Sequence, residues 1–138
     1  MSVEQSVEIV EAFWREVWQA RNPAAASGRV AENFVITSGG LQIVGREAFI
    51  EWIAAFLQGI EAFQFRSIES FQNADGSRVA SRWTFSGRNN GFLGGRACGT
   101  PFEMRGNAIL HVQPDGLLQH NWVERNALEV YRQVIGLQ

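Results

Sequence analysis

The stretch AFQFRSIESFQNADGSRVASRWTFSGR, residues 62–88, decides the fold of this chain because it contains two long strand-like segments joined by a turn. Apolar and polar residues alternate on both sides of the turn, as they do in strands that are buried on one face. The letters NADGS between the two segments are typical of a tight turn. The stretch therefore predicts an antiparallel pair of strands.

Two further strand-like segments follow this pair. They are TPFEMRGNAILHV, residues 100–112, and LLQHNWVE, residues 117–124, with the turn sequence QPDG between them. Long strands that are contiguous in the chain pair readily with their neighbours, so we expect a curved antiparallel sheet. The closing sequence NALEVYRQVIG predicts a short helix.

Helical spacing of apolar residues comes before the strands. It runs from Ser2 to about Arg21 and again from Gly45 to about Gly59, and FVITS and LQIVG suggest a short hairpin between these helices. Helices first and a bent sheet after predict an α+β fold. We expect one domain over residues 1–138, shaped as a cone, with the N-terminal helices on the concave face of the sheet.

Composition excludes several functions. The net charge is −2 and all 12 basic residues are scattered arginines, which argues against binding to nucleic acid. The lack of lysine removes Schiff-base chemistry, a pyridoxal anchor and a Walker-type phosphate loop. The two histidines, His111 and His120, lack metal-binding spacing, so we expect no metal and no cofactor.

Location is the next expectation. No segment reaches 18 apolar residues, so we expect no membrane span. The acidic start MSVEQSVEIVE lacks the basic residues of a signal peptide, and the lone Cys98 permits no internal disulfide. These features favour a cytoplasmic protein.

A carboxylate falls on an apolar face of the first strand of the quoted pair. By alternation Glu69 shares its face with Phe65 and Phe71, which predicts an inward position. A carboxylate among aromatic rings would have a raised pKa and could act as a general acid or base. A bulge that swings Glu69 outward, or an arginine partner, is the alternative.

The last strand carries a second polar group. His120, Trp122, Glu124 and Asn126 share one face with Leu118, and we expect this face to point inward because the alternate set is more polar. Glu124, Asn126 and His120 are therefore candidate catalytic residues together with Glu69. As an alternative, Asn126 is placed to cap the closing helix.

The five tryptophans and ten phenylalanines either fill the core or line a pocket with an apolar wall. The pocket interpretation predicts these substrate-binding residues: Trp14, Trp18, Phe34, Trp52, Phe56, Phe65, Trp83, Phe85, Asn89, Met104 and Trp122.

Three segments in order resemble a known family. They are DGSRVASRWTFSGRNNGFLGG, then ACGTPFEMRGNAILHVQPDGLLQHNW, then the tail ending RQVIG. Together they resemble the SnoaL-like polyketide cyclases of the nuclear transport factor 2-like superfamily. The resemblance implies a cone-shaped pocket, a homodimer and, often, no metal or cofactor. It also implies ring closure by an intramolecular aldol step, in which a carboxylate at the end of the last strand takes the proton.

This chain departs from the family pattern at both acid/base positions. Asn126 stands where the family has its aspartate, and Asn89 stands where it has a histidine. An amide takes no proton near neutral pH, although it can donate a hydrogen bond to a developing oxyanion.

Three functions remain open. The first is a metal-free acid/base enzyme, of the cyclase, isomerase, dehydratase or epoxide-opening type, acting on a hydrophobic polyketide-like or cyclic molecule. Glu124 or Glu69 would be its base, and Asn126, His120 and Asn89 would hold the substrate oxygen. The second is a non-catalytic module that binds or carries an apolar small molecule. The third is a structural dimerisation domain whose cavity is closed by tryptophans.

Overall fold

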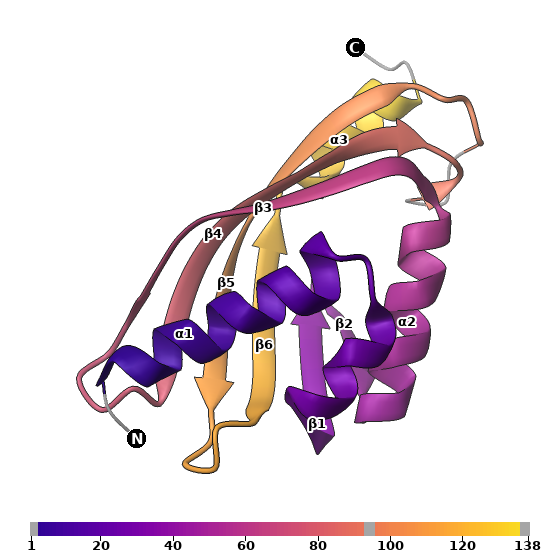
Figure 1. Cartoon of the computed structure of the whole chain (residues 1–138). Helices are drawn as coiled ribbons and strands as arrows, with labels where there is room; N and C mark the ends of the chain where they lie inside the picture. Colours follow the sequence, from indigo (N-terminus) through magenta and orange to yellow (C-terminus); the bar gives the residue numbers. More distant parts are fainter. Residues whose placement is uncertain (1–2, 93–95, 136–138) are drawn as a thin grey trace.

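The computed structural model describes residues 3–92 and 96–135 (Figure 1). Ser2 and Gly136, where the sequence predicted a helix start and a helix end, lie outside the described residues, as do residues 93–95 of the segment that resembles the family. The elements run in the order α1 (Val3–Phe13), η1 (Trp14–Gln19), η2 (Pro23–Gly28), β1 (Val30–Ser38), β2 (Leu41–Val44), α2 (Arg46–Gln58), β3 (Ile60–Gln72), β4 (Arg78–Asn89), β5 (Pro101–Val112), β6 (Leu118–Arg125) and α3 (Ala127–Val134).

The strands form one curled sheet in the order β2-β1-β6-β5-β4-β3. Helices α1 and α2 lie over its concave side, and α3 packs near the far end of the long strands (Figure 1). The α+β fold with a curved sheet is therefore confirmed. One strand pair departs from the predicted antiparallel pattern, because β1 runs parallel to β6. No helix among the described residues is long and apolar enough to span a membrane.

The first helix changes its winding before it ends. Residues 14–19 form a π-helical turn, in which Ala20 N donates to Arg15 O at 2.9 Å and Asn22 N to Val17 O at 2.9 Å. Such turns are frequent at functional sites. This one directs Trp14 and Trp18 into the interior, where 3% and 8% of each residue remain exposed.

Helix α2 ends against the loop that follows β4. A Cβ atom on Gly59 would lie 2.8 Å from Phe92 Cβ, so only glycine permits this approach. The amides of Asn90 and Phe92 donate to Gly59 O at 2.8 and 3.2 Å. The end of α2 and this loop therefore lie side by side at the open end of the sheet.

Strand β3 contains an extra residue. Ser67 pairs with Trp83 and Glu69 pairs with Arg82, so Ile68 is left without a cross-strand partner. An extra residue reverses which side chains face the core beyond it. Ser70 consequently faces inward, whereas Glu69 and Phe71 face outward, and the predicted inward position of both is wrong.

Strand β6 has the same irregularity near its start. His111 pairs with His120 and Val112 with Leu118, so Gln119 is extra. Gln119 Oε1 accepts a hydrogen bond from Gln113 Nε2, and Gln119 Nε2 donates to Asn33 O. Beyond this bulge the buried face of β6 is the one that sequence alternation assigned to the outside.

Candidate functional site

A narrow slot lies between the helices and the concave face of the sheet. Its volume is about 40 Å³, so it is close to filled by its own walls. The lining is almost entirely aromatic or aliphatic, and it consists of Trp14, Trp18, Ile36, Ser38, Trp52, Phe56, Phe65, Trp83, Phe85, Asn121, Val123 and Arg125.

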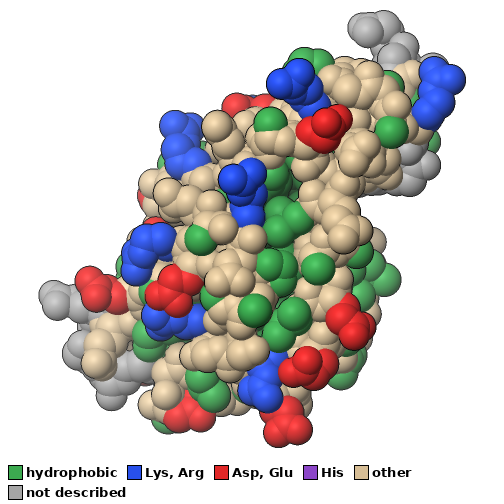
Figure 2. All heavy atoms as spheres, turned by 45° about the vertical axis from the view of Figure 1, so that its right-hand side comes forward, with side chains coloured by type: hydrophobic (Ala, Val, Ile, Leu, Met, Phe, Trp, Pro, Cys, Tyr) green, Lys and Arg blue, Asp and Glu red, His purple; other side chains and the backbone are tan. Residues whose placement is uncertain are grey.

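The slot adjoins a wider vestibule of about 560 Å³. Ser38, Trp52, Phe56 and Arg125 line both spaces, so the two form one site with a deep narrow part and an open part. The end of α2 and the loop at residues 90–92 complete the vestibule. Figure 2, which brings the α2 side forward, shows hydrophobic side chains gathered in the middle of this face.

A chain of hydrogen bonds fixes one wall of the slot. Trp14 Nε1 donates to Ser81 Oγ at 3.0 Å, and Ser81 Oγ lies 2.7 Å from Ser70 Oγ. The hydroxyls of Ser70 and Ser67 both donate to Glu11 Oε2, at 2.5 and 2.8 Å. The β3 bulge makes this possible because it turns Ser70 inward, and the network holds the Trp14 indole in one orientation.

Arg125 is the charged group at the junction of slot and vestibule. Its guanidinium lies over the Phe56 ring at 5.6 Å, and its Nη1 approaches Met104 Sδ at 3.5 Å. Burial lowers the pKa of Arg125 from its ordinary value. Within the described part of the chain, no carboxylate forms an ion pair with this guanidinium.

Three buried polar atoms of slot residues have no hydrogen-bond partner in the described structure. They are Trp18 Nε1, Trp83 Nε1 and Asn121 Oδ1. Buried polar groups in proteins are nearly always paired, with protein, water or ligand. Two donors and one acceptor of slot-lining residues are therefore left unpaired in an apolar setting.

The predicted pocket residues divide into three groups: those that line the slot, those that are buried outside it, and Trp122 on the outer face of the sheet. Seven line the slot, namely Trp14, Trp18, Trp52, Phe56, Phe65, Trp83 and Phe85. Phe34 and Met104 are fully buried in the core. Asn89 is also fully buried, but its amide donates to Arg96 O at 2.7 Å and accepts from Gly91 N at 3.0 Å. These bonds hold the loop after β4, so the Asn89 amide is occupied.

Glu69 and Glu124 lie on the outer face of the sheet, away from the slot. Glu69 is 2.7 Å from Arg82 Nε, and about half of its side chain is exposed. Both alternatives raised for Glu69, a bulge and an arginine partner, are found together. Glu124 pairs with Asn107 on β5 and is exposed. The predicted inward position of both carboxylates is wrong because each follows a bulge.

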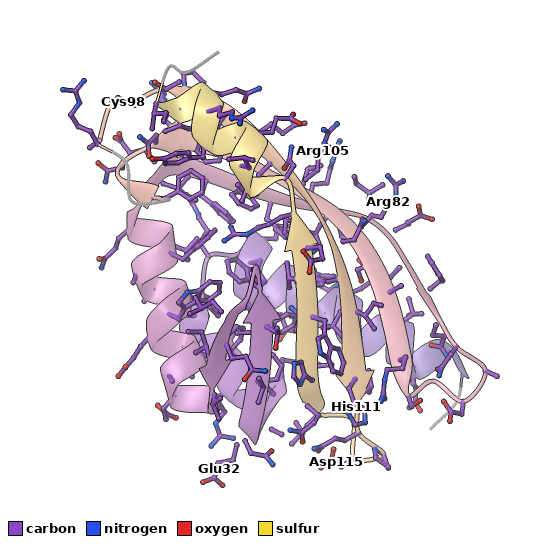
Figure 3. All side chains as sticks on the ribbon, turned by 180° about the vertical axis from the view of Figure 1, so that it is seen from behind. Glu32, Arg82, Cys98, Arg105, His111 and Asp115 are labelled. Atoms are coloured by element: carbon purple, nitrogen blue, oxygen red, sulfur yellow. The ribbon has the colours of Figure 1, made fainter. Side chains whose placement is uncertain are left out.

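His120 and Trp122 share this outer face, which Figure 3 views directly with Arg82, Arg105 and His111 labelled. Their rings stack with centroids 3.8 Å apart, and His120 Nε2 lies 2.9 Å from Thr37 Oγ1. Trp122 is 40% exposed and contacts the Arg78 guanidinium, so its predicted place in the pocket is also wrong.

Asn126 connects the end of β6 to the neighbouring strand. Its Oδ1 accepts from Arg105 N at 2.9 Å, and its own N–H donates to Arg105 O at 3.2 Å. It occupies the N-cap position of α3 but makes no side-chain capping bond. The predicted capping position is therefore observed, whereas the amide stabilises the strand end and not the helix.

Ile36 and Ser38 on β1 were not among the predicted slot residues. Strand alternation also missed three slot residues on β6: Asn121, Val123 and Arg125. A signal for them existed in the sequence, because Leu118 and Val123 are both apolar but stand five positions apart. Regular alternation cannot bury both, and an extra residue between them can.

Among residues 3–92 and 96–135, no group of three or more His, Cys, Asp or Glu side chains is placed to hold a metal ion. The curled sheet, the helices on its concave face and the aromatic slot define a protein with the nuclear transport factor 2-like, or ketosteroid isomerase-like, fold. The sequence profile of the SnoaL-like polyketide cyclases matches residues 8–134, and the chain belongs to this family. No functionally curated protein gave a significant match to the sequence.

Solved structures support the same fold at low sequence identity. A protein from Jannaschia sp. CCS1 assigned to the SnoaL-like polyketide cyclases superimposes with a TM-score of 0.85 at 18% identity, over 98% of this chain and 94% of that one. A protein with a ketosteroid isomerase-like fold from Catenulispora acidiphila, in complex with trimethylamine, gives 0.78 at 22%, over 95% and 94%. An epoxide hydrolase from M. tuberculosis gives 0.73 at 13%, over 96% and 86%.

Proposed function

We propose that this SnoaL-like protein binds a flat, apolar small molecule in the vestibule, against the mouth of the slot, and that it does so without proton transfer by a carboxylate or histidine of the pocket. The observation that carries the proposal is the lining itself. Of the described residues that surround the two spaces, none is Asp, Glu, His, Cys or Tyr.

An aldol cyclase needs a general base within hydrogen-bond reach of the proton that it removes. Glu69 and Glu124 both point outward, so neither carboxylate is positioned to act as this base for a ligand in the pocket. The aromatic walls, in contrast, suit ring-shaped ligands, because ligand sites are mostly apolar with a few placed polar groups. Binding without conversion is therefore the better supported of the two small-molecule functions.

A fluorescence titration tests the binding. The protein is titrated with polycyclic ketones, phenols and epoxides, and each mixture is then examined by mass spectrometry. We expect saturable quenching of tryptophan emission with ligand masses unchanged. Trp52→Leu, in the wall shared by slot and vestibule, should weaken binding about tenfold, whereas Trp122→Leu on the outer face should leave it within twofold. No saturable binding across the panel contradicts the proposal.

A second candidate is an enzyme that stabilises the enolate formed when solvent water takes the proton next to the carbonyl of a bound ketone. Arg125 and the unpaired Trp18 and Trp83 N–H groups favour it, because donors in a dry site lower the energy of a developing oxyanion. The test is incorporation of deuterium from D₂O next to the carbonyl of a bound ketone. Exchange that is faster with the protein than without it supports this candidate, and exchange at the solvent rate removes it.

We also propose that the outer face of the sheet packs against a second copy of the chain. Large apolar side chains are exposed there, namely Ile68, Phe71, Ile109 and Trp122. Exposed apolar surface of this kind is typical of association sites. We expect a dimer in sedimentation analysis, and dissociation when Ile109→Asp places a charge on this face. A monomeric wild type contradicts this proposal.

A further inference from the structure

Arg125 carries a charge that the described structure does not balance. The residue is mostly buried, its guanidinium lies over Phe56, and no ion pair with a carboxylate forms. Taking a cation out of water is costly unless it is paired, and a cation–π contact recovers only part of that cost. Unlike Arg125, the arginines Arg29 and Arg82 do pair with a carboxylate, and both lie outside the slot and vestibule.

The position of Arg125 tells where a balancing charge would come from. It is one of the four residues that line both slot and vestibule, with Ser38, Trp52 and Phe56. No acidic side chain is among the described residues that line either space. A molecule that enters through the vestibule therefore meets an uncompensated guanidinium beside two aromatic rings.

We propose that the ligand of this pocket is an aromatic carboxylate, with its ring system against Trp52 and Phe56 and its carboxylate paired with Arg125. The inference rests on the proposed binding function and adds the charge of the ligand to it. The planar guanidinium offers paired N–H donors that match the two oxygens of a carboxylate. Gln58 and Asn90, at the vestibule, add polar side chains next to the same space.

The β6 bulge is what gives the pocket this charge. If Gln119 paired regularly opposite His111 instead of forming the bulge, Glu124 would face the slot and Arg125 would face out, because successive side chains of a strand point to opposite faces. The same strand would then present an anion, and its preferred ligand would be neutral or cationic. The ligand charge therefore depends on Gln119 being accommodated as a bulge and not within a regular ladder.

The experiment compares two probes of nearly the same shape. 2-Naphthoate and 2-naphthamide differ in charge but little in ring size, and binding of each to the full chain is measured by isothermal titration calorimetry at pH 7.5. Anthracene-2-carboxylate and its amide repeat the comparison with a larger ring. The variants are Arg125→Met, which removes the charge at similar length, and Arg125→Lys, which keeps the charge but not the fork. Arg88→Met, an exposed arginine on the outer face, is the matched control.

We expect wild type to bind each carboxylate at least tenfold more tightly than its amide. Arg125→Met should reduce this ratio to about one by weakening the carboxylate while leaving the amide within twofold, and Arg88→Met should keep the wild-type ratio. Arg125→Lys should fall between them. Thermal unfolding of each variant shows that it is folded.

Three results overturn the inference. Equal affinity of wild type for acid and amide removes the anion preference while leaving the proposed binding function intact. If folded Arg125→Met still binds the carboxylate more tightly than the amide, the preference comes from a group other than Arg125. Failure of wild type to bind any of the four probes contradicts the binding function and this inference together.

Discussion

Strands β4 and β5 pair with each other regularly, whereas β6 contains one extra residue and β3 contains two, one between Glu61 and Gln64 and the other at Ile68. The β4–β5 ladder pairs without interruption from Arg78 with His111 to Arg88 with Pro101. In β3 and β6, residues Ile68 and Gln119 break the alternation. Of the regular pair, β4 contributes two aromatic residues to the lining of the slot, Trp83 and Phe85. The irregular strands decide which polar groups reach it, since a bulge re-aims every side chain that follows.

The regular pair depends on a close contact between opposite residues. Trp83 lies across from Gly106, and a Cβ on that glycine would stand 2.3 Å from the indole. Gly106→Val should therefore lower the free energy of unfolding by about 3 kcal/mol, because the ring cannot move without disturbing its packed neighbours. Urea denaturation measures this. Gly28→Ala, where no atom lies within 4 Å of the added Cβ, is the control and should cost under about 1 kcal/mol. A loss below about 1 kcal/mol for Gly106→Val would contradict the contact.

The β3 bulge separates two carboxylates with different surroundings. Glu11 accepts hydrogen bonds from Ser67 and Ser70 on the inner face, whereas Glu69 pairs with Arg82 in solvent. Glu11→Ala should cost about 2 kcal/mol, since charge-assisted bonds to two hydroxyls are lost. Glu69→Ala should cost less than about 1 kcal/mol. Equal losses in urea denaturation, or a larger loss for Glu69→Ala, would show that the bulge does not turn these side chains as described.

The histidine pair at the β6 bulge gives a pH dependence. Burial lowers the pKa of both His111 and His120 below the ordinary value of 6.5, with smaller contributions from Arg78 to the first and from His111 to the second. The unfolded state therefore binds more protons below pH 6.5, and the free energy of unfolding should fall as the pH falls through that value. Urea denaturation at pH 7.5 and 5.5 should show a smaller fall in His111→Gln. A fall of unchanged size in this variant would mean that His111 contributes nothing.

The smallest effect is expected at Glu124. Because it lies on the outer face, Glu124→Gln should change the affinity for 2-naphthoate less than twofold. Its neighbour Arg125 serves as the contrasting position in the same titration. A tenfold change in this affinity in Glu124→Gln would place the carboxylate in the pocket. It would contradict the assignment of Glu124 to the outer face of β6.

Much of the fold could be predicted from the sequence, because hydrophobic spacing marks helices and strands directly. The inward set of β4, including Val79, Trp83 and Phe85, follows from alternation and is found buried. Alternation failed only beyond the bulges. A bulge shifts the pairing of a strand by one residue and leaves its composition unchanged, so the sequence of β3 gives no sign of its bulge. In β6 the spacing of Leu118 and Val123 gives a weak sign.

The polar site residues were harder to predict for a second reason. The resemblance to the family assigned Asn89 and Asn126 to its acid/base positions. The structure shows that each amide is used by backbone groups, of Arg96 and Gly91 in the first case and of Arg105 in the second. Sequence position identifies the strand end but not the local partner. Partners of this kind depend on loop geometry that a residue pattern does not encode.

The central claim is that the Gln119 bulge turns Val123 and Arg125 into the slot and Trp122 and Glu124 out of it. Methyl–aromatic NOE spectroscopy of the protein tests it most directly. We predict NOEs from the Val123 methyl groups to ring protons of Trp52 or Phe56 on α2, which share the slot with Val123. NOEs from the Trp122 ring to those α2 rings, with none from Val123, would contradict the account.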